Sequence, residues 1–213
     1  MKVCIYGVGA IGGFIGTRLA LAGGCTVSAV ARGATLAALR THGLRLQQGG
    51  ELLCAPVQAS DDPAALGVQD LVVIAVKGPA LADVAARIAP LVGPQTLLLP
   101  AMNGVPWWFG AGAPAGSALG DAPLQSIDPG GRIAAALPLG QVIGCVVHAS
   151  TFTPEPGLVG HKMGQGLIIG EPLGGDSARV QALAGLLQRA GFDVTASADV
   201  RRDIWYKLWG NMT

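Results

Sequence analysis

The segment Lys2–Gly16 reads KVCIYGVGAIGGFIG and decides the fold. Its residues up to Tyr6 form a short apolar run that ends at a glycine, which indicates a buried parallel strand. Gly7, Gly9 and Gly12 then fit the pattern G-x-G-x-x-G, and an apolar helix follows. A strand, a glycine loop and a helix in this order are the context that a dinucleotide-binding motif requires.

Each glycine of this loop has a separate task. Gly7 permits a tight turn, Gly9 lets the backbone approach a pyrophosphate, and Gly12 lets the helix pack closely on the strand. Amides at the start of the helix would face the phosphates, helped by the helix dipole. The alternative is a glycine-rich contact between helix and sheet that binds nothing. We expect a dinucleotide to be held by the whole loop, namely Gly7, Val8, Gly9, Ala10, Ile11 and Gly12.

The residue at the end of the second strand predicts which dinucleotide is bound. A site for NAD places Asp or Glu about 20 residues beyond the glycine motif, on a ribose hydroxyl. That count reaches Arg32, and no acidic residue occurs from Met1 to Gly50. A guanidinium can bind a 2′-phosphate with two hydrogen bonds, whereas a carboxylate would repel it. We therefore expect NADP(H), unless Arg32 is merely an exposed loop charge.

Strands and helices alternate along the rest of the chain. Further strands are expected at Thr26–Ala31, Asp70–Val76, Gln95–Leu99, Val142–Ala149 and Phe192–Thr195. Helices are expected at Ala10–Ala22, Ala34–Arg40, Ala80–Ala89 and Ser177–Ala190, with a last one starting near Val200 after a capping Asp199. Hairpins are expected around Gly49–Gly50 and within Pro154–Gly170. The pattern predicts an α/β fold of the Rossmann type, with a doubly wound and mainly parallel sheet.

Composition excludes several classes of protein. The chain has 213 residues, of which 51% are hydrophobic and 13% charged, with a formal net charge of +1. A charge this small argues against nucleic acid or an anionic membrane as partner. No apolar run approaches the ~18 residues of a membrane span, so we expect a cytoplasmic protein. The four cysteines form no CxxC pair, and we expect neither a metal site nor disulfides.

Lys77, Asn103 and the pair of Lys207 and Asn211 occur where strands or a helix would meet a cofactor, and the chain has four short motifs outside the glycine loop. These motifs are AVKG at 75–78, NGV at 103–105, PGLVGH at 156–161 and WYKLWGN at 205–211. Together with GVGAIGG, they make the chain resemble the ketopantoate reductase (2-dehydropantoate 2-reductase) family along essentially its whole length. The last motif is the most specific, because many enzymes share Rossmann glycines but few have a WxKLxxN helix after them.

The resemblance implies an oxidoreductase that reduces a 2-keto acid with NADPH, with 2-dehydropantoate in pantothenate biosynthesis as the leading substrate. It implies that Lys207 is the general acid and that Asn211 binds the substrate. Asn103 would contact both the nicotinamide end of the cofactor and the substrate. Lys77 would lie beside the cofactor, and Ser150 would line the nicotinamide pocket.

The resemblance also divides the chain. Residues 1–198 would be the NADP-binding Rossmann domain, and residues 199–213 the first helix of a truncated, all-helical second domain. Met212 and Thr213 lie in mid-helix without a stop signal, which supports this expectation. The missing part would set the choice of substrate, and the sequence leaves the oligomeric state open, a homodimer being allowed.

Two alternatives stay open. One is another NADP-dependent hydroxyacid or opine-type dehydrogenase. The other is a non-catalytic NADP(H)-binding module, which would not need Lys207 and Asn211 one turn apart on a helix. Of the histidines, His161 is expected to be structural, and His148 to be a hydrogen-bonded core residue.

Overall fold

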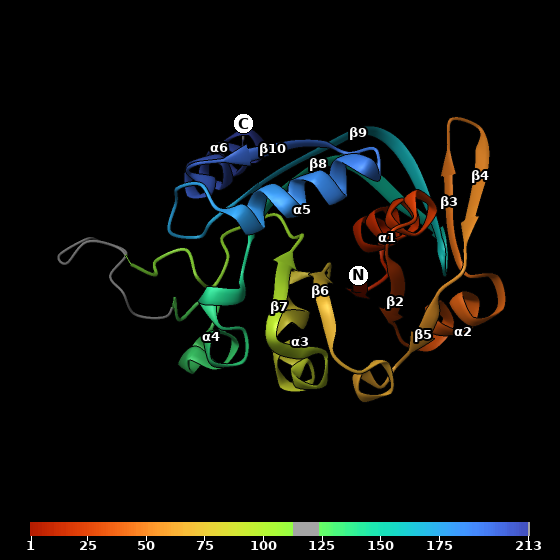
Figure 1. Cartoon of the computed structure of the whole chain (residues 1–213), viewed down its shortest axis with the longest axis horizontal. Helices are drawn as coiled ribbons and strands as arrows, with labels where there is room; N and C mark the ends of the chain where they lie inside the picture. The colour runs from red at the N-terminus through yellow and green to blue at the C-terminus, as the bar shows by residue number, and fades with distance from the viewer. Residues whose placement is uncertain (113–123, 213) are drawn as a thin grey trace.

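The computed structural model describes residues 1–112 and 124–212, with side chains described to residue 210. Two five-stranded sheets form the framework (Figure 1). The first has the order β5-β2-β1-β6-β7. All its neighbours are parallel, and its strands are β1 (Lys2–Tyr6), β2 (Thr26–Val30), β5 (Gln58–Ser60), β6 (Gln69–Ile74) and β7 (Val92–Pro100). This sheet is the Rossmann-type parallel sheet that the sequence predicts.

Helix α1 (Ala10–Ala22) lies between the two sheets (Figure 1). Its glycines allow the close approach on both sides. A Cβ atom on Gly16 would come within 2.9 Å of Ile5 in the parallel sheet, and one on Gly13 within 2.5 Å of Val159 in the second sheet. A helix that is buried on opposite faces has to be mostly apolar, and in α1 only Thr17 and Arg18 are polar.

The second sheet is mixed, and the sequence did not indicate that its strands would meet. It contains β3 (Leu44–Gln48), β4 (Glu51–Ala55), β8 (Gly144–Glu155), β9 (Leu158–Gly170) and β10 (Asp193–Ser197). β8 and β9 form the long hairpin around Gly157, while β3 and β10 both pair with β9 in parallel. The chain enters β8 from the edge of the parallel sheet, where Val142 pairs with Leu98.

The remaining helices cover the parallel sheet or flank it (Figure 1). They are α2 (Gly33–His42), α3 (Leu81–Arg87), α4 (Arg132–Ala136) and α5 (Ala178–Arg189). Short 3₁₀ turns occur at Pro63–Leu66, Gly78–Ala80, Ala89–Leu91, Pro129–Gly131 and Leu139–Gln141. The expected helices and hairpins are confirmed with shifted ends, whereas the expected strand at 142–149 is wrong in length, because its pairing with β9 extends it to Glu155.

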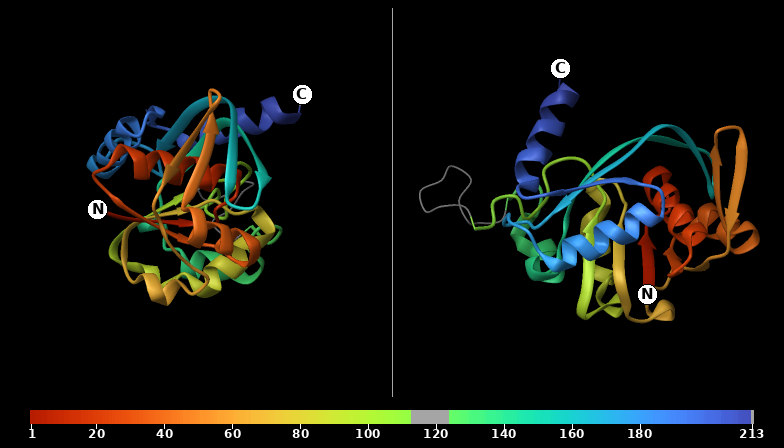
Figure 2. Two further views of the ribbon diagram at one scale, coloured as in Figure 1. Left: turned by 90° about the vertical axis from the view of Figure 1, so that its right-hand side faces the viewer. Right: turned by 45° about the horizontal axis from the view of Figure 1, so that its top comes forward.

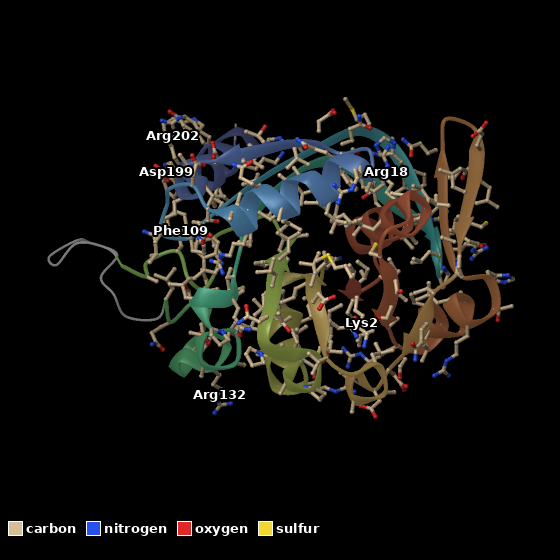
Figure 3. All side chains as sticks on the ribbon, viewed as in Figure 1. Lys2, Arg18, Phe109, Arg132, Asp199 and Arg202 are labelled. Atoms are coloured by element: carbon tan, nitrogen blue, oxygen red, sulfur yellow. The ribbon has the colours of Figure 1, made fainter. Side chains whose placement is uncertain are left out.

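Helix α6 (Val200–Met212) projects from the body of the molecule (Figure 2). As predicted, Asp199 caps its first turn by accepting a hydrogen bond from the amide of Arg202 at 3.2 Å (Figure 3). Ile204 is buried against the rest of the protein, while Trp205, Tyr206 and Trp209 are exposed. Among the described residues, no helix is long and apolar enough to cross a membrane.

Candidate active site

The glycine loop joins β1 to α1 in the geometry that the motif predicts. Gly7 has a φ of 94°, which favours glycine. A Cβ atom on Gly12 would lie 2.0 Å from the carbonyl oxygen of Gly7, so no larger residue fits there. A Cβ atom on Gly9 would meet nothing within 4 Å, which leaves open space above the backbone. Gly9 is also the N-cap of α1 and provides no side-chain cap, so the first amides of the helix face that space.

A cleft of about 200 Å³ opens beside this loop, and we call it the glycine-loop cleft. It is lined by Tyr6, Gly7, Val8, Gly9, Val30, Ala31, Arg32, Thr35, Val76, Ala80, Val84 and Arg87. Its lining therefore comes from the carboxyl ends of β1, β2 and β6 and from the helices that follow them. In open parallel sheets, this is the edge at which ligands bind.

The polar groups of the cleft suit an anionic ligand. Arg32 and Arg87 both line it, and the hydroxyl of Tyr6 is buried without a hydrogen-bond partner. Burial raises the pKa of Tyr6, so the hydroxyl stays protonated and can donate. Two cations and free amide and hydroxyl donors in one cleft fit the phosphates of a dinucleotide.

The surroundings of Arg32 differ from the sequence-based expectation in one respect. Its guanidinium lies 3.0 Å from the carboxylate of Asp83, which belongs to α3. The sequence has no acidic residue near Arg32 along the chain, and only the packing of α3 beside β2 brings one there. Asp83 and Arg87 are spaced as i and i+4, which is typical of a solvated helix face. Nothing in the sequence therefore indicated that these two residues lie at the cleft.

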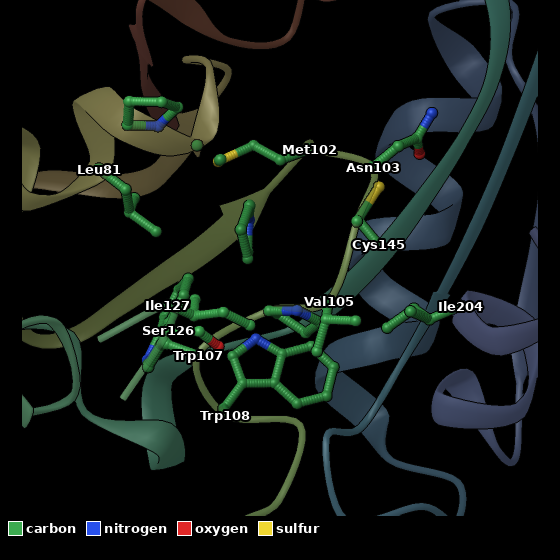
Figure 4. Close-up of a pocket in the computed structure, with 15 residues that line it drawn as sticks. Leu81, Met102, Asn103, Val105, Trp107, Trp108, Ser126, Ile127, Cys145 and Ile204 are labelled. Carbon is green, nitrogen blue, oxygen red and sulfur yellow. The ribbon is translucent and has the colours of Figure 1, made fainter. Parts of the chain in front are cut away.

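A second and larger cavity lies at the carboxyl ends of β6 and β7 (Figure 4). We call it the tryptophan cavity, after Trp107 and Trp108 in its wall. Its volume is about 390 Å³, and Asn103 stands at its edge. Both polar atoms of the Asn103 amide bond to β8. Nδ2 donates to the carbonyl of Val147 and Oδ1 accepts from its amide, each at 3.1 Å.

Lys207 does not line the tryptophan cavity. It lies in a shallow depression with His148, Ile168, Asp203, Tyr206 and Gly210. Partial loss of solvation beside α6 and the positive charge of Lys207 lower the pKa of His148. His148 is exposed there, so the expectation of a core histidine is wrong, because this position of β8 lies at the surface beside α6 and not in an apolar cluster. His161 is structural as expected, stacked on Phe14 with ring centroids 4.7 Å apart.

The other expected site residues occupy separate positions. Lys77 is exposed. Its neighbour Val76 lines the glycine-loop cleft, and its other neighbour Gly78 lines the tryptophan cavity. Ser150 is exposed on β8, opposite Met163 of β9. Asn211 is within α6, but its side chain lies outside the described part of the chain. Among the described residues, no three His, Cys, Asp or Glu side chains are grouped to hold a metal ion.

Comparison with known proteins shows the family of the chain. Residues 3–120 match the family Ketopantoate reductase PanE/ApbA. The chain belongs to this family. It is 43% identical over 213 residues to a 2-dehydropantoate 2-reductase from Mesorhizobium japonicum, covering 100% of this chain and 65% of that protein. The chain thus spans slightly less than two thirds of this ketopantoate reductase relative.

Solved structures of the family have the same fold. A candidate ketopantoate reductase from Ralstonia solanacearum superposes with a TM-score of 0.93 at 53% identity, over 99% of this chain and 64% of the other. A 2-dehydropantoate 2-reductase from Porphyromonas gingivalis has a TM-score of 0.78 at 28% identity, over 97% and 67%. The mixed second sheet is therefore shared with ketopantoate reductases and is part of the family fold.

Proposed function

We propose that this protein is an NADP(H)-dependent reductase that converts a 2-keto acid to the 2-hydroxy acid, with 2-dehydropantoate as substrate in pantothenate biosynthesis. The observation that carries the proposal is the open backbone at Gly9, which lines the same cleft as two arginines in a ketopantoate reductase family chain.

The residues of the glycine-loop cleft fit an NADP(H) molecule. The amides at the start of α1 would bind the pyrophosphate above Gly9. Arg32 would bind the 2′-phosphate, since its guanidinium follows β2 at the edge where the ribose of a dinucleotide sits in Rossmann folds. Lys77, which lies between the two cavities, would face the middle of the cofactor. The nicotinamide would then lie toward Asn103 and Ser150.

The reaction requires a hydride and a proton. When bound, the reduced nicotinamide supplies the hydride to the carbonyl carbon. Lys207 would donate a proton from Nζ to the carbonyl oxygen, which would otherwise become an alkoxide. Asn103 has one N–H left after bonding to Val147, and this group and Asn211 would hold the substrate. The product would be the 2-hydroxy acid together with the oxidised cofactor.

The role of Lys207 can be tested by Lys207→Ala. We expect kcat for 2-dehydropantoate to fall about 10²-fold or more, because a proton donor acts mainly in the transition state. The dissociation constant of NADPH should stay the same, since the cofactor groups lie on other elements. Lys162→Ala removes an exposed lysine of β9 and serves as the matched control. A Lys207→Ala variant with unchanged kcat would contradict the assignment of Lys207.

A further inference from the structure

The tryptophan cavity is large and has no charged side chain in its described lining. Leu81, Met102, Val105, Ile127 and Ile204 contribute apolar surface, in addition to the indoles. An apolar cavity of about 150 Å³ is enough to hold benzene. A volume of about 390 Å³ therefore has room for a branched or aromatic group. A carboxylate would be poorly placed in it, because burying an unpaired charge is costly.

One polar group of the cavity wall lacks a partner. Trp108 is 3% exposed, and its indole Nε1 makes no hydrogen bond. Figure 4 shows the nitrogen edge of this indole turned toward the interior of the cavity. A buried donor without an acceptor costs about 1–3 kcal/mol, so it is unusual unless something else supplies the acceptor.

The cavity adjoins the residues assigned to the chemistry. Asn103 stands at its edge, and Ile204 of α6 lines it. Lys207 is three residues beyond Ile204 on the same helix, so the two side chains are neighbours on one helix face. Ile204 thus connects the wall of the cavity to the helix that carries Lys207, and Asn103 belongs to the same wall.

We propose that the tryptophan cavity takes the side chain of the 2-keto acid, and that the indole N–H of Trp108 donates a hydrogen bond to an acceptor on that side chain. This rests on the proposed function. Trp108 is then the residue that distinguishes a keto acid whose bulky side chain carries a hydroxyl from one whose side chain lacks it. Small keto acids would leave the cavity unfilled, and bulky ones without an oxygen would leave Trp108 unpartnered.

The test compares three acids with NADPH as reductant. Pyruvate has a small side chain, 3,3-dimethyl-2-oxobutanoate has a bulky apolar one, and 2-dehydropantoate has the same branched side chain with a terminal hydroxyl. We expect kcat/KM to rise about tenfold or more from the first acid to the second, and about tenfold again to the third. Quenching of tryptophan fluorescence by each acid gives affinities that do not depend on turnover.

Trp108→Phe keeps most of the bulk and removes the N–H. It should lower kcat/KM for 2-dehydropantoate by about tenfold and leave 3,3-dimethyl-2-oxobutanoate almost unaffected, so that the two acids become equivalent. Trp205→Phe makes the same change at an exposed position and is the matched control. Val105→Phe, which fills part of the cavity, should impair both bulky acids more than pyruvate.

The outcomes separate the two proposals. If none of the three acids is reduced by the wild type, the proposed function is wrong. If pyruvate is reduced as well as the bulky acids, or if Trp108→Phe affects both bulky acids equally, the cavity does not read the side chain and the inference is overturned, while the proposed function stands.

Discussion

At the residue scale, three glycines of one loop are fixed by three different physical constraints. Gly7 needs its positive φ, and Gly12 needs the missing side chain because the carbonyl of Gly7 lies against it. Gly9 needs neither for folding, since its backbone is in the β region and a Cβ atom would be free of contacts. In the proposed function, glycine is needed at position 9 because the pyrophosphate approaches the backbone there.

This difference predicts opposite behaviour of two similar variants. Gly9→Ala should change the free energy of unfolding by less than about 1 kcal/mol, because cap preference and chain entropy nearly offset each other. It should weaken NADPH binding strongly, because the methyl group stands where the pyrophosphate must approach. Gly12→Ala should destabilise the fold by about 3 kcal/mol or more through overpacking. Urea unfolding and NADPH fluorescence titration measure the two effects, and tight NADPH binding by Gly9→Ala would show that no phosphate lies there.

The guanidinium of Arg32 forms an ion pair with Asp83, so this carboxylate competes with the 2′-phosphate that we assign to Arg32. Its ion pair with Asp83 joins two side chains that are 63% and 46% exposed, so the pair itself stabilises the fold little. The carboxylate would nevertheless repel a 2′-phosphate beside Arg32. We therefore expect Asp83 to affect the choice between NADPH and NADH.

We predict that Asp83→Asn raises the affinity for NADPH by about 1.5- to 5-fold, in line with ~0.2–1 kcal/mol for an exposed charge pair, and leaves NADH affinity nearly unchanged. Arg32→Ala should act in the opposite direction, on the order of tenfold for NADPH. Glu51→Gln removes one negative charge at the exposed β3–β4 turn and controls for net charge. Equal changes for both cofactors would show that Asp83 does not face the phosphate.

At the element scale, a group of polar residues fixes α5 between the two sheets. Glu171, just beyond β9, accepts a hydrogen bond from Ser177, the N-cap of α5, and pairs with Arg179. Arg179 also donates to the carbonyls of Gly140 and Val142, where the chain crosses from one sheet to the other. The side chains of Glu171 and Arg179 are 15% and 30% exposed, so the pair is only partly screened by water.

Glu171→Gln should lower the free energy of unfolding at pH 7 by about 1.5–3 kcal/mol, the range for hydrogen bonds to charged groups. The hydrogen bond from Arg179 lowers the pKa of Glu171 below its ordinary 4.5. The stabilisation is therefore complete above that pH and is lost as the pH falls through the lowered value. Urea unfolding should show wild type and variant converging in acid. Glu155→Gln removes the carboxylate of a pair in which the side chain of Glu155 is 58% exposed and that of Arg45 is 16% exposed. Because water screens this carboxylate more than that of Glu171, the substitution should cost under about 1 kcal/mol at pH 7. A loss equal to that of Glu171→Gln would contradict this difference.

At the scale of the whole molecule, two apolar clusters share one sheet. Leu183 of α5 belongs to the cluster between the two sheets, and Leu98 of β7 to the cluster on the other face of the parallel sheet. The strands contribute alternate side chains to each cluster. We therefore expect residues 1–198 to unfold as one cooperative unit.

Leu98→Ala and Leu183→Ala should each destabilise the protein by about 2–5 kcal/mol. Far-ultraviolet circular dichroism and the fluorescence of Trp107 and Trp108, followed in a Trp205→Phe/Trp209→Phe background, should give coincident transitions in both variants. Two separated transitions, with only one shifted by each substitution, would mean that the layers fold independently and that the proposed domain of residues 1–198 is divided.

The sequence by itself determined the features that depend on local chemistry. The glycine loop, its flanking strand and helix, the β3–β4 hairpin and the cap of α6 all follow from residues close together in the chain, because turn conformation, capping and apolar periodicity are local properties. The resemblance to ketopantoate reductases, carried by short motifs such as WYKLWGN, was also readable without a structure.

Only the tertiary structure decided which distant residues meet. In sequence, the second sheet looks like two hairpins and two separate strands. Only the folded chain shows that β3, β8 and β10 all pair with β9. Asp83 reaches Arg32, and Trp107 and Trp108 come to wall a cavity beside Asn103, because elements far apart in the chain pack together. Such contacts arise from burial of surface summed over the whole molecule, and no local pattern encodes them.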